Sequence, residues 1–164
     1  MLETSRLLIK PFTLAMMRAA IKGPAAFRQV AEVNVEAGYP AADYLAMFPF
    51  KIEHMTANPE ALAFECFVIL KETNTIMADI GFKGGPDAAG RMDIGYSVMP
   101  RYRGCGLATE MVTAMTAWGK RQPGVKMLTA HCDKANQASY HVLRNAGFRM
   151  VKETEDGFYF EINA

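Results

Sequence analysis

The sequence predicts an α/β fold of the α+β type, with a mixed, mostly antiparallel central sheet and helices on both faces of that sheet. Three observations support this fold class. Helical patterns follow a short first strand, three strand-forming runs then succeed one another between residues 62 and 99, and the rest alternates helix and strand before a final hairpin. The length of 164 residues and the hydrophobic content of 51% suit a single domain over residues 1–164.

The first third of the chain predicts one strand followed by helices. Residues 6–10 form a short apolar run that Pro11 ends, and Thr13 can cap the helix that follows. Pro49 should kink the last helical segment or divide it into two short helices. The expected elements are a strand at 6–10, helices at 13–21 and 25–37, and a helical segment at 43–55.

The remaining two thirds predict most of the sheet. Two runs of strand formers flank turn residues at 72–75, which indicates a hairpin. Gly147 follows the last predicted helix, at the position where a glycine commonly ends one. The expected elements are strands at 62–70, 76–82 and 92–99, a helix at 107–121, a strand at 125–132, a helix from 136 to 146, and hairpin strands at 149–153 and 157–162.

Composition and charge disfavour several classes of protein. The formal net charge of +1 argues against a direct nucleic-acid partner. Cys66, Cys105 and Cys132 have neither disulfide-framework nor C-x-x-C spacing, so we expect reduced thiols and no structural metal site. The N-terminus lacks the pattern of a secretory signal, and no apolar run approaches the roughly 18 residues of a membrane span. We therefore expect a cytoplasmic protein with no membrane partner.

An anion site is predicted where the strand at 92–99 meets the helix at 107–121. The connection between them contains Arg101, Arg103, Gly104 and Gly106. Glycines let the backbone approach an anion closely, and a helix N-terminus presents unpaired N–H groups together with the positive end of its dipole. A strand, a basic glycine turn and a helix in this order are typical of phosphate binding.

Two motifs resemble the GNAT family of acetyl-CoA-dependent N-acetyltransferases. Residues 103–108, Arg-Gly-Cys-Gly-Leu-Ala, are similar to the R/Q-x-x-G-x-G/A loop of that family. Residues 136–148, which open with Asn and close with Gly-Phe, resemble its second signature. Residues 3–9 and the Asp-Ile-Gly-Tyr segment at 93–96 look like the branch that contains bacterial ribosomal-protein alanine N-acetyltransferases. The order of elements agrees with the family over nearly the whole chain.

The resemblance implies acetyl-CoA as co-substrate, with the loop binding the pyrophosphate of coenzyme A. It also implies that the strands at 92–99 and 125–132 splay apart to admit the pantetheine arm. A strand amide, at Val98 or just before it, would then polarise the thioester carbonyl. The coenzyme-binding residues that the resemblance implies are Val98, Arg103, Gly104, Cys105, Gly106, Leu107, Ala108, Thr109, Asn136 and Ser139.

Besides the Val98 amide, the resemblance implies catalytic roles for Ser139 and Asp93. Many family members carry a Tyr seven residues after the Asn as general acid, but Leu143 stands there in this chain. Ser139, three residues after the Asn, matches the usual substitute in the branch. It shares a helix face with Asn136, whereas the adjacent Tyr140 is turned about 100° away.

The general base is the least determined part of the predicted site. Asp93 is the first candidate because family members often carry a carboxylate on this strand, and an amine must lose a proton to attack. Glu65 and Asp79, on the neighbouring strands, are rivals. His131 is interpreted as a strand-end residue near the same cleft. His54 and His141 are expected at the surface, and none of the histidines forms a metal-ligand cluster.

The leading functional interpretation is transfer of acetyl from acetyl-CoA to a primary amine by direct attack in a ternary complex. The acceptor is either a protein N-terminal α-amine or a small-molecule amine. The alternative is a non-catalytic acetyl-CoA-binding or sensing module, which the missing Tyr at position 143 favours. A nucleotide-dependent enzyme is disfavoured, because the chain lacks the GxxxxGK[ST] loop and the GxGxxG fingerprint. The branch implies a monomer or a homodimer.

Overall fold

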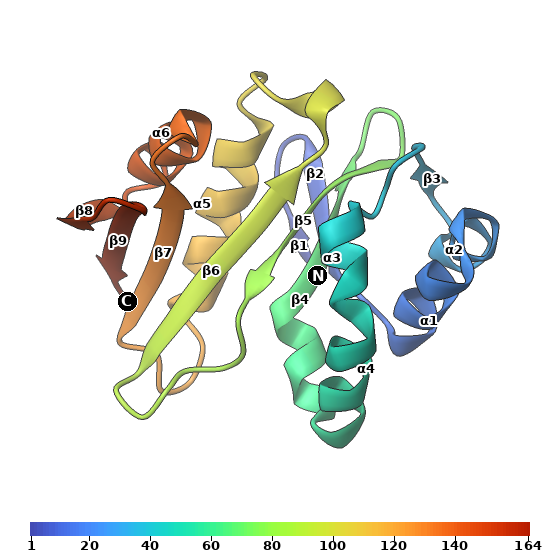
Figure 1. Cartoon of the computed structure of the whole chain (residues 1–164), viewed down its shortest axis with the longest axis horizontal. Helices are drawn as coiled ribbons and strands as arrows, with labels where there is room; N and C mark the ends of the chain where they lie inside the picture. Colours follow the sequence, from blue (N-terminus) through green and yellow to red (C-terminus); the bar gives the residue numbers. More distant parts are fainter.

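The computed structural model describes residues 1–164 and is built on a nine-stranded sheet (Figure 1). The strand order is β1-β2-β4-β5-β6-β7-β9-β8, and β3 pairs with β5 off this path. Only the pairs β6–β7 and β3–β5 are parallel, so the sheet is mixed and mostly antiparallel, as predicted. The strands are β1 (Leu2–Glu3), β2 (Leu7–Pro11), β3 (Asn34–Val35), β4 (Glu65–Leu70), β5 (Thr75–Phe82), β6 (Arg91–Val98), β7 (Met127–Asp133), β8 (Arg149–Glu153) and β9 (Gly157–Asn163).

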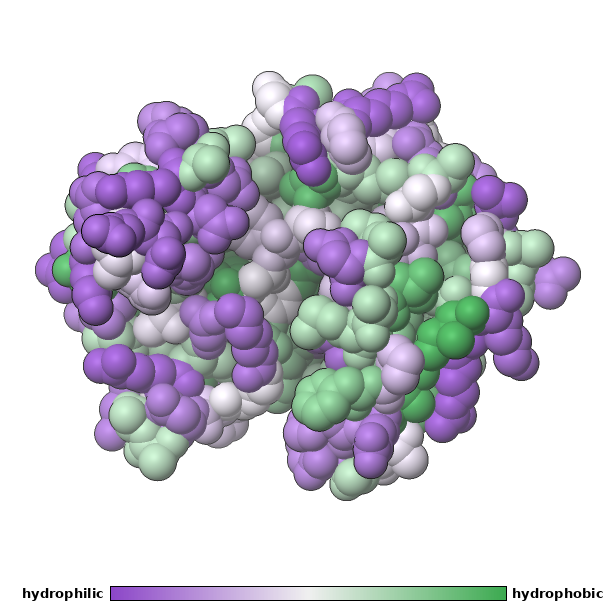
Figure 2. Space-filling view, viewed as in Figure 1, coloured by the Kyte–Doolittle hydropathy of each residue, from purple (hydrophilic) through white to green (hydrophobic).

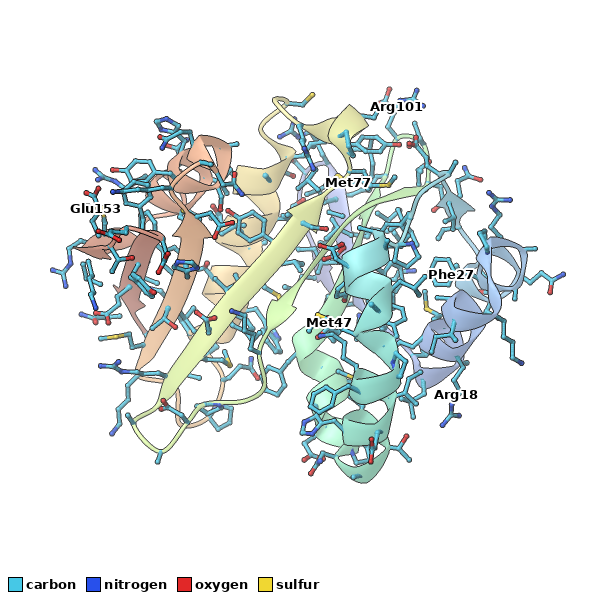
Figure 3. All side chains as sticks on the ribbon, in the orientation of Figure 1. Arg18, Phe27, Met47, Met77, Arg101 and Glu153 are labelled. Carbon is cyan, nitrogen blue, oxygen red and sulfur yellow. The ribbon has the colours of Figure 1, made fainter.

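Helices cover both faces of the sheet, which confirms the predicted architecture. One apolar core joins α5 and α6 to β5, β6, β7 and β9, and a second joins α1, α2 and α4 to β2, β4 and β5. Phe27 of α2 is fully buried in the second core (Figure 3). The helices are α1 (Leu14–Lys22), α2 (Pro24–Ala31), α3 (Ala42–Ala46), α4 (Phe48–Ala57), α5 (Leu107–Gly119) and α6 (Gln137–Asn145), with short 3-10 helices η1 (Pro59–Phe64) and η2 (Pro100–Tyr102). None of these helices has the length and apolar character needed to cross a bilayer.

Local signals in the sequence account for several helix ends. The Thr13 hydroxyl accepts the N–H of Met16 at 3.1 Å and caps α1. The side chain of Asn136 caps α6 in the same way, by accepting the N–H of Ser139 at 3.1 Å. After α6, Gly147 takes a positive φ of 93°, and the N–H of Phe148 reaches back to the Leu143 carbonyl at 3.0 Å. This is the glycine-terminated ending that the sequence predicted.

Two boundaries differ clearly from the predicted ones. The second helix ends at Ala31 rather than 37, because Glu32 turns into the left-handed region and residues 34–35 form a strand beside β5. The strand expected at 62–70 begins at Glu65, since residues 59–64 form η1. The segment at 43–55 is divided into two helices, as the sequence predicted from Pro49. They meet at Met47 because Pro49 lies in the first turn of α4, where no intrahelical bond needs its missing N–H.

The parallel pair at the centre of the sheet opens partway along its length. Cα pairing between β6 and β7 runs only from Arg91–Met127 to Ile94–Ala130. Both strands continue beyond these pairs, β6 to Val98 and β7 to Asp133. Residues 95–98 therefore present one backbone edge that has no strand partner, as the predicted splay requires.

Candidate active site

The connection from β6 to α5 has the geometry of an anion-binding loop. Gly104 and Gly106 take positive φ angles of 76° and 75°, and no atom lies within 4 Å of a Cβ built on Gly104. Gly106 is the N-cap of α5 and supplies no side-chain cap. Because the first intrahelical bond joins the Glu110 N–H to the Gly106 carbonyl, the N–H groups of residues 107–109 have no intrahelical partner. These groups point out of the helix end, where a phosphate would be stabilised.

Residues 4–6, near the N-terminus, hold this loop in place through side-chain hydrogen bonds. The carboxylate of Glu110, in the first turn of α5, accepts hydrogen bonds from the Thr4 and Ser5 hydroxyls and from the backbone and side chain of Arg6, at 2.6–3.0 Å. Arg6 also donates to the Cys105 carbonyl at 3.0 Å. Desolvation alone would raise the pKa of Glu110, but these hydrogen bonds lower it to about 2. The loop is thus held by charge-assisted contacts that its own sequence does not reveal.

The two arginines near the loop have different roles. Arg103 donates from Nε to the Val98 carbonyl at 2.9 Å, so it fixes the end of β6 against the loop. Arg101 is exposed at the edge of the molecule (Figure 3) and pairs with Glu36 at 3.2 Å. Tyr102 also donates to the Glu36 carboxylate, at 2.5 Å. The segment before α3 is thereby connected to η2.

The backbone of β6 presents its free groups to the splay. In a strand, the backbone N–H and C=O groups of successive residues point alternately toward the two neighbouring strands. The Asp93 carbonyl and the Met99 N–H bond toward β5, at 2.9 Å each, so odd-numbered residues of this strand face β5. The N–H groups of Tyr96 and Val98 therefore point to the opposite side, into the opening between β6 and β7. This places the Val98 amide where the resemblance implied an amide for the thioester carbonyl.

The first turn of α6 lies across the same opening. Ser139 is half-buried, and its hydroxyl is 2.8 Å from the hydroxyl of Tyr96 on β6. Leu143 is fully buried among apolar side chains. Tyr140 packs its ring against Phe158 and Phe160 of β9, with centroids 4.9 and 5.5 Å apart, and is directed away from the splay. Of the hydroxyl groups on α6, only that of Ser139 is bonded to β6.

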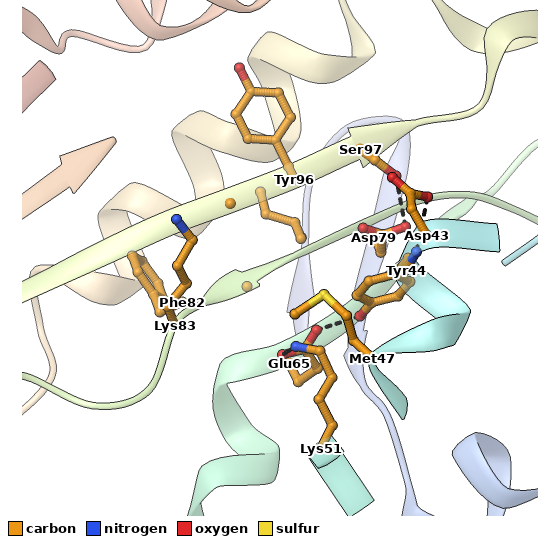
Figure 4. A pocket seen from close by; sticks show the side chains of 13 residues that line it. Asp43, Tyr44, Met47, Lys51, Glu65, Asp79, Phe82, Lys83, Tyr96 and Ser97 are labelled. Atoms are coloured by element: carbon orange, nitrogen blue, oxygen red, sulfur yellow. Dashed lines mark hydrogen bonds and ion pairs between the residues drawn. The ribbon is translucent and has the colours of Figure 1, made fainter. Parts of the chain in front are cut away.

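A pocket with three carboxylates lies on the other face of β6 (Figure 4). Its volume is about 290 Å³, and it lies between α3, α4 and the strands β4, β5 and β6. Glu65 is already paired there, because it accepts hydrogen bonds from the Tyr44 hydroxyl and from Lys51, the latter at 2.6 Å. Asp79 accepts a single hydrogen bond, from the Ser97 hydroxyl to Oδ2 at 2.8 Å. Its Oδ1 has no partner in the protein.

Asp79 is the carboxyl group whose protonation the fold changes most. Its side chain is buried, with 6% exposure. Burial raises the pKa of Asp79 to about 7, and the nearby Glu65 adds to the shift, while the Ser97 hydrogen bond and Lys51 oppose it. A buried carboxyl group that titrates near neutral pH in a pocket is a candidate general base.

Asp93 lies in a different hollow on the same face of the sheet. Its oxygens accept from Lys83 at 2.6 Å and from the Thr129 hydroxyl at 2.9 Å, where β6 is still paired with β7. This groove, of about 470 Å³, also contains His131, whose ring lies 4.6 Å from that of Tyr159. The space-filling view shows a recess in the middle of this face, with a strongly hydrophilic half over β7–β9 and α6 on one side and a more apolar half over α3 and α4 on the other (Figure 2).

Sequence reasoning identified most of these groups and missed their partners. Asp79 was a rival for the base, but its burial depends on α3 and α4 covering β5. The bond between Tyr96 and Ser139 was not foreseen, because it joins residues 43 apart. The attachment of Arg6 to Glu110 was also missed. Its only signal was the Thr-Ser-Arg segment, which the resemblance included without a role. His54 and His141 are exposed, as expected.

Comparisons with known proteins agree with this geometry. The model of the acetyltransferase (GNAT) domain matches residues 6–149 of this chain. The chain belongs to the GNAT acetyltransferase family. A curated relative, the uncharacterized N-acetyltransferase YjdG of Bacillus subtilis, is 27% identical over 151 residues, which cover 90% of this chain and 89% of that protein. The chain is accordingly an acetyl-CoA-dependent N-acetyltransferase.

Solved structures share the fold at low identity. The ribosomal-protein-S5-alanine acetyltransferase of Vibrio fischeri superposes with a TM-score of 0.70 at 15% identity, covering 99% of this chain and 95% of that one. Mycobacterium smegmatis RimJ, in complex with CoA-disulfide, gives a TM-score of 0.67 at 16% identity and covers 96% and 82% of the two chains. Similarity at this level establishes the architecture and leaves the acceptor to be inferred from the site.

The acetyltransferase presents a surface that suits coenzyme A. The open space over Gly104, the unpaired N–H groups of residues 107–109 and the unpartnered edge of residues 95–98 form one line along the end of β6. Phosphate oxygens accept hydrogen bonds from such N–H groups, and an amide-bearing arm bonds to a free strand edge in the manner of an added strand. The residues present therefore fit the co-substrate that the family uses.

Proposed function

We propose that this acetyltransferase moves the acetyl group of acetyl-CoA to a primary amine bound in the pocket between α3, α4 and β4–β6, by direct attack with Asp79 as general base. The observation that carries this proposal is the position of Asp79. It pairs with Ser97 across β5 and β6, one register step from the Ala78–Val98 pair whose amide faces the splay. The Asp79 carboxylate, as proton acceptor, and the Val98 N–H, as hydrogen-bond donor to the oxyanion, thus lie at neighbouring register positions of one strand pair.

Different residues of the chain bind the co-substrate and assist the reaction. The amides of residues 104–109, with Gly104 and Gly106 giving access, bind the pyrophosphate, and Arg103 holds the loop to the strand. Asn136 caps α6 and so fixes Ser139 at the splay. The bound co-substrate supplies an acyl group activated as a thioester. The Val98 N–H donates to its carbonyl oxygen, and a single preorganised donor of this kind is worth about 3 kcal/mol in the transition state.

The pKa of Asp79 favours an α-amine as acceptor. A base with a pKa of about 7 takes a proton from an N-terminal α-ammonium, with a pKa of about 8, at little cost. The same transfer from a Lys side chain, with a pKa of about 10.4, costs about 3 kcal/mol more, since one pKa unit corresponds to about 1.4 kcal/mol. Among the primary amines considered, the base is thus matched to a polypeptide N-terminus.

The shape of the surface also supports a polypeptide acceptor. Lys83 lines both the carboxylate pocket and the groove beside Asp93 and His131, so the two hollows adjoin at this side chain. Gly95 lies between Asp93 and Ser97 on this face of β6, and its missing side chain leaves the passage open, because a Cβ there would meet only the Lys83 Cε at 3.9 Å. The residues that follow a bound N-terminus have an extended trench to occupy. A small amine would fill the first hollow alone.

Blocking this passage should separate long acceptors from short ones. Replacement of Gly95 by valine is compatible with a strand and places two methyl groups in the trench. We expect kcat/KM for a peptide that extends beyond the passage to fall about tenfold or more, with coenzyme A affinity unchanged. A dipeptide with the same first residues is the matched control and should react as with the wild type. Equal losses for both acceptors would contradict the trench as the peptide path.

A further inference from the structure

One contact near the splay has no role in the mechanism above. Asp79 pairs with Ser97, so the side chain of the adjacent Tyr96 leaves β6 on the opposite face of the sheet, apart from the Asp79 and Ser97 side chains (Figure 4). It crosses to α6, where its hydroxyl lies 2.8 Å from the Ser139 hydroxyl. Tyr96 stands beyond the last β6–β7 pair, at Ile94, so this bond spans the opening between the strands. The same hydroxyl also lies 3.4 Å from the Ser139 carbonyl oxygen, and these two contacts connect the free end of β6 to the second signature helix.

The Ser139 hydroxyl alone is poorly suited to donate to a leaving sulfur, and the contact with Tyr96 can fix its orientation. A serine hydroxyl is a weak acid, and it can rotate freely with one proton and two lone pairs. Without a fixed orientation, its proton is directed at a departing sulfur for only part of the time. A donor that occupies one lone pair removes this freedom and leaves the serine proton for another acceptor. The only side chain positioned to donate from β6 is Tyr96.

The two hydroxyl groups can each donate in this contact, and the Tyr96 phenol carries a proton to donate. Burial raises the pKa of Tyr96 to about 12, against a smaller opposing effect of Ser139, so the phenol stays protonated at any physiological pH. Burial likewise raises the pKa of the Cys132 thiol at the end of β7, while the Ser139 hydroxyl lowers it. Both groups are therefore neutral at physiological pH, and the Tyr96 hydroxyl is able to donate to Ser139.

We propose that Tyr96 is a positioning residue, whose hydroxyl donates to Ser139 and thereby directs the serine proton at the sulfur that leaves during acetyl transfer. This inference rests on the proposed function of the same site. In the step concerned, the amine nitrogen forms a bond to the acetyl carbon and the carbon–sulfur bond breaks. The sulfur departs with the bonding pair, stabilised by the hydrogen bond from Ser139. Asp79 first accepts one proton from the acceptor's ammonium group, which frees the nitrogen lone pair for attack. The nitrogen loses a second proton as the amide forms, and this balances the proton that the released thiolate takes up.

The test compares single and double variants under steady-state conditions. Replacement of Tyr96 by phenylalanine removes only the hydroxyl and keeps the ring packed. We expect kcat to fall about tenfold, the consequence of one lost hydrogen bond in the transition state, while KM for acetyl-CoA and coenzyme A affinity stay within about twofold. Ser139→Ala should lower kcat at least as much. The double variant should be no slower than Ser139→Ala alone, because Tyr96 acts only through the serine.

Tyr140→Phe is the matched control, since it removes a neighbouring phenol whose ring packs on β9, and it should leave kcat unchanged. Wild-type kcat in Tyr96→Phe would overturn the inference, as would a double variant whose loss is the product of the two single losses. A raised KM with unchanged kcat would assign Tyr96 to binding instead and overturn it equally. The wild-type enzyme separates the two claims: if it acetylates no amine, the proposed function fails, whereas an active wild type with an equally fast Tyr96→Phe contradicts only the role of Tyr96.

Discussion

Replacement of Asp79 by asparagine should lower kcat by about 10²- to 10⁴-fold, the usual contribution of a general base, while affinity for coenzyme A is unchanged. Asparagine has nearly the same shape and keeps an oxygen that can accept from Ser97. It cannot take a proton from the attacking amine. Steady-state kinetics with calorimetric measurement of coenzyme binding would show the separation. A variant that retains more than about half of wild-type kcat would remove Asp79 from the role of base.

The pH dependence of kcat/KM provides a second test of Asp79 as the general base. The base must be deprotonated, so kcat/KM of the wild type should rise with pH and level off above about 7, the pKa to which burial raises Asp79. Asp93→Asn is the comparison, because Asp93 is held by Lys83 and Thr129 in the outer groove, and that variant should keep the inflection. The opposite result, an inflection lost with Asp93 and kept without Asp79, would identify Asp93 as the base.

The same carboxyl group should make the folded protein less stable at high pH. The pKa of Asp79 is about 7 in the folded state and 3.8 ordinarily, so the folded state holds its proton more tightly. The free energy of unfolding therefore decreases as pH rises from about 4 through about 7. Asp79→Asn should melt at a higher temperature than the wild type at pH 8, with a gain of at most about 4 kcal/mol, and at nearly the same temperature near pH 4. A loss of activity with a gain in stability also shows that the variant is folded.

The second large effect is expected at Gly106. Its φ of 75° lies in the left-handed region, where a β-branched residue is strained, and a valine side chain would stand at the N-terminus of α5, where we propose that the phosphates bind. Gly106→Val should therefore reduce coenzyme A affinity below detection by calorimetry, by denying the anion close approach to the helix N–H groups. Unchanged affinity would contradict the placement of the pyrophosphate on this loop.

Gly124→Val is the control that distinguishes the effect of backbone strain from the effect of obstructing the coenzyme site. Gly124 follows the opposite end of α5, has a φ of 80°, and its added Cβ would meet only Pro86 at 3.7 Å, much as a Cβ at Gly106 would meet Arg6 at 3.6 Å. Both variants pay a similar backbone cost of about 1–3 kcal/mol. Only Gly106→Val should lose the coenzyme, and equal losses in both would attribute the effect to unfolding.

The parts of the fold that the sequence predicts well are those encoded by neighbouring residues. Thr13 and Gly147 mark helix ends through local backbone geometry and hydrogen bonds, and both act as expected. The second helix was overestimated because residues 32–37 continue an apolar pattern. Asn34 instead donates to the Thr73 carbonyl and its N–H to that of Asn74, so contacts to a distant turn override the local pattern.

The candidate site likewise has a part that neighbouring residues encode and a part that depends on distant contacts. The backbone shape of the loop before α5 could be predicted, because the consecutive residues around Gly104 and Gly106 determine it. The choice between Asp93 and Asp79 depends on which carboxyl group is buried and which is already paired. Those properties arise from the packing of α3 and α4 over β5, and from the Lys83 side chain folding onto Asp93. Spacing along the chain carries no information about either.

The most direct test of the account is acetyl transfer by the purified protein from acetyl-CoA to a panel of short peptides and small amines. Mass spectrometry would identify the acetylated products, and thiol release would measure turnover. We predict acetylation of peptide N-terminal α-amines with matching thiol release, weaker reaction with small amines, and loss of both signals in Asp79→Asn. Tight binding of acetyl-CoA without acetylation of any amine would contradict catalysis and favour the acetyl-CoA-sensing alternative.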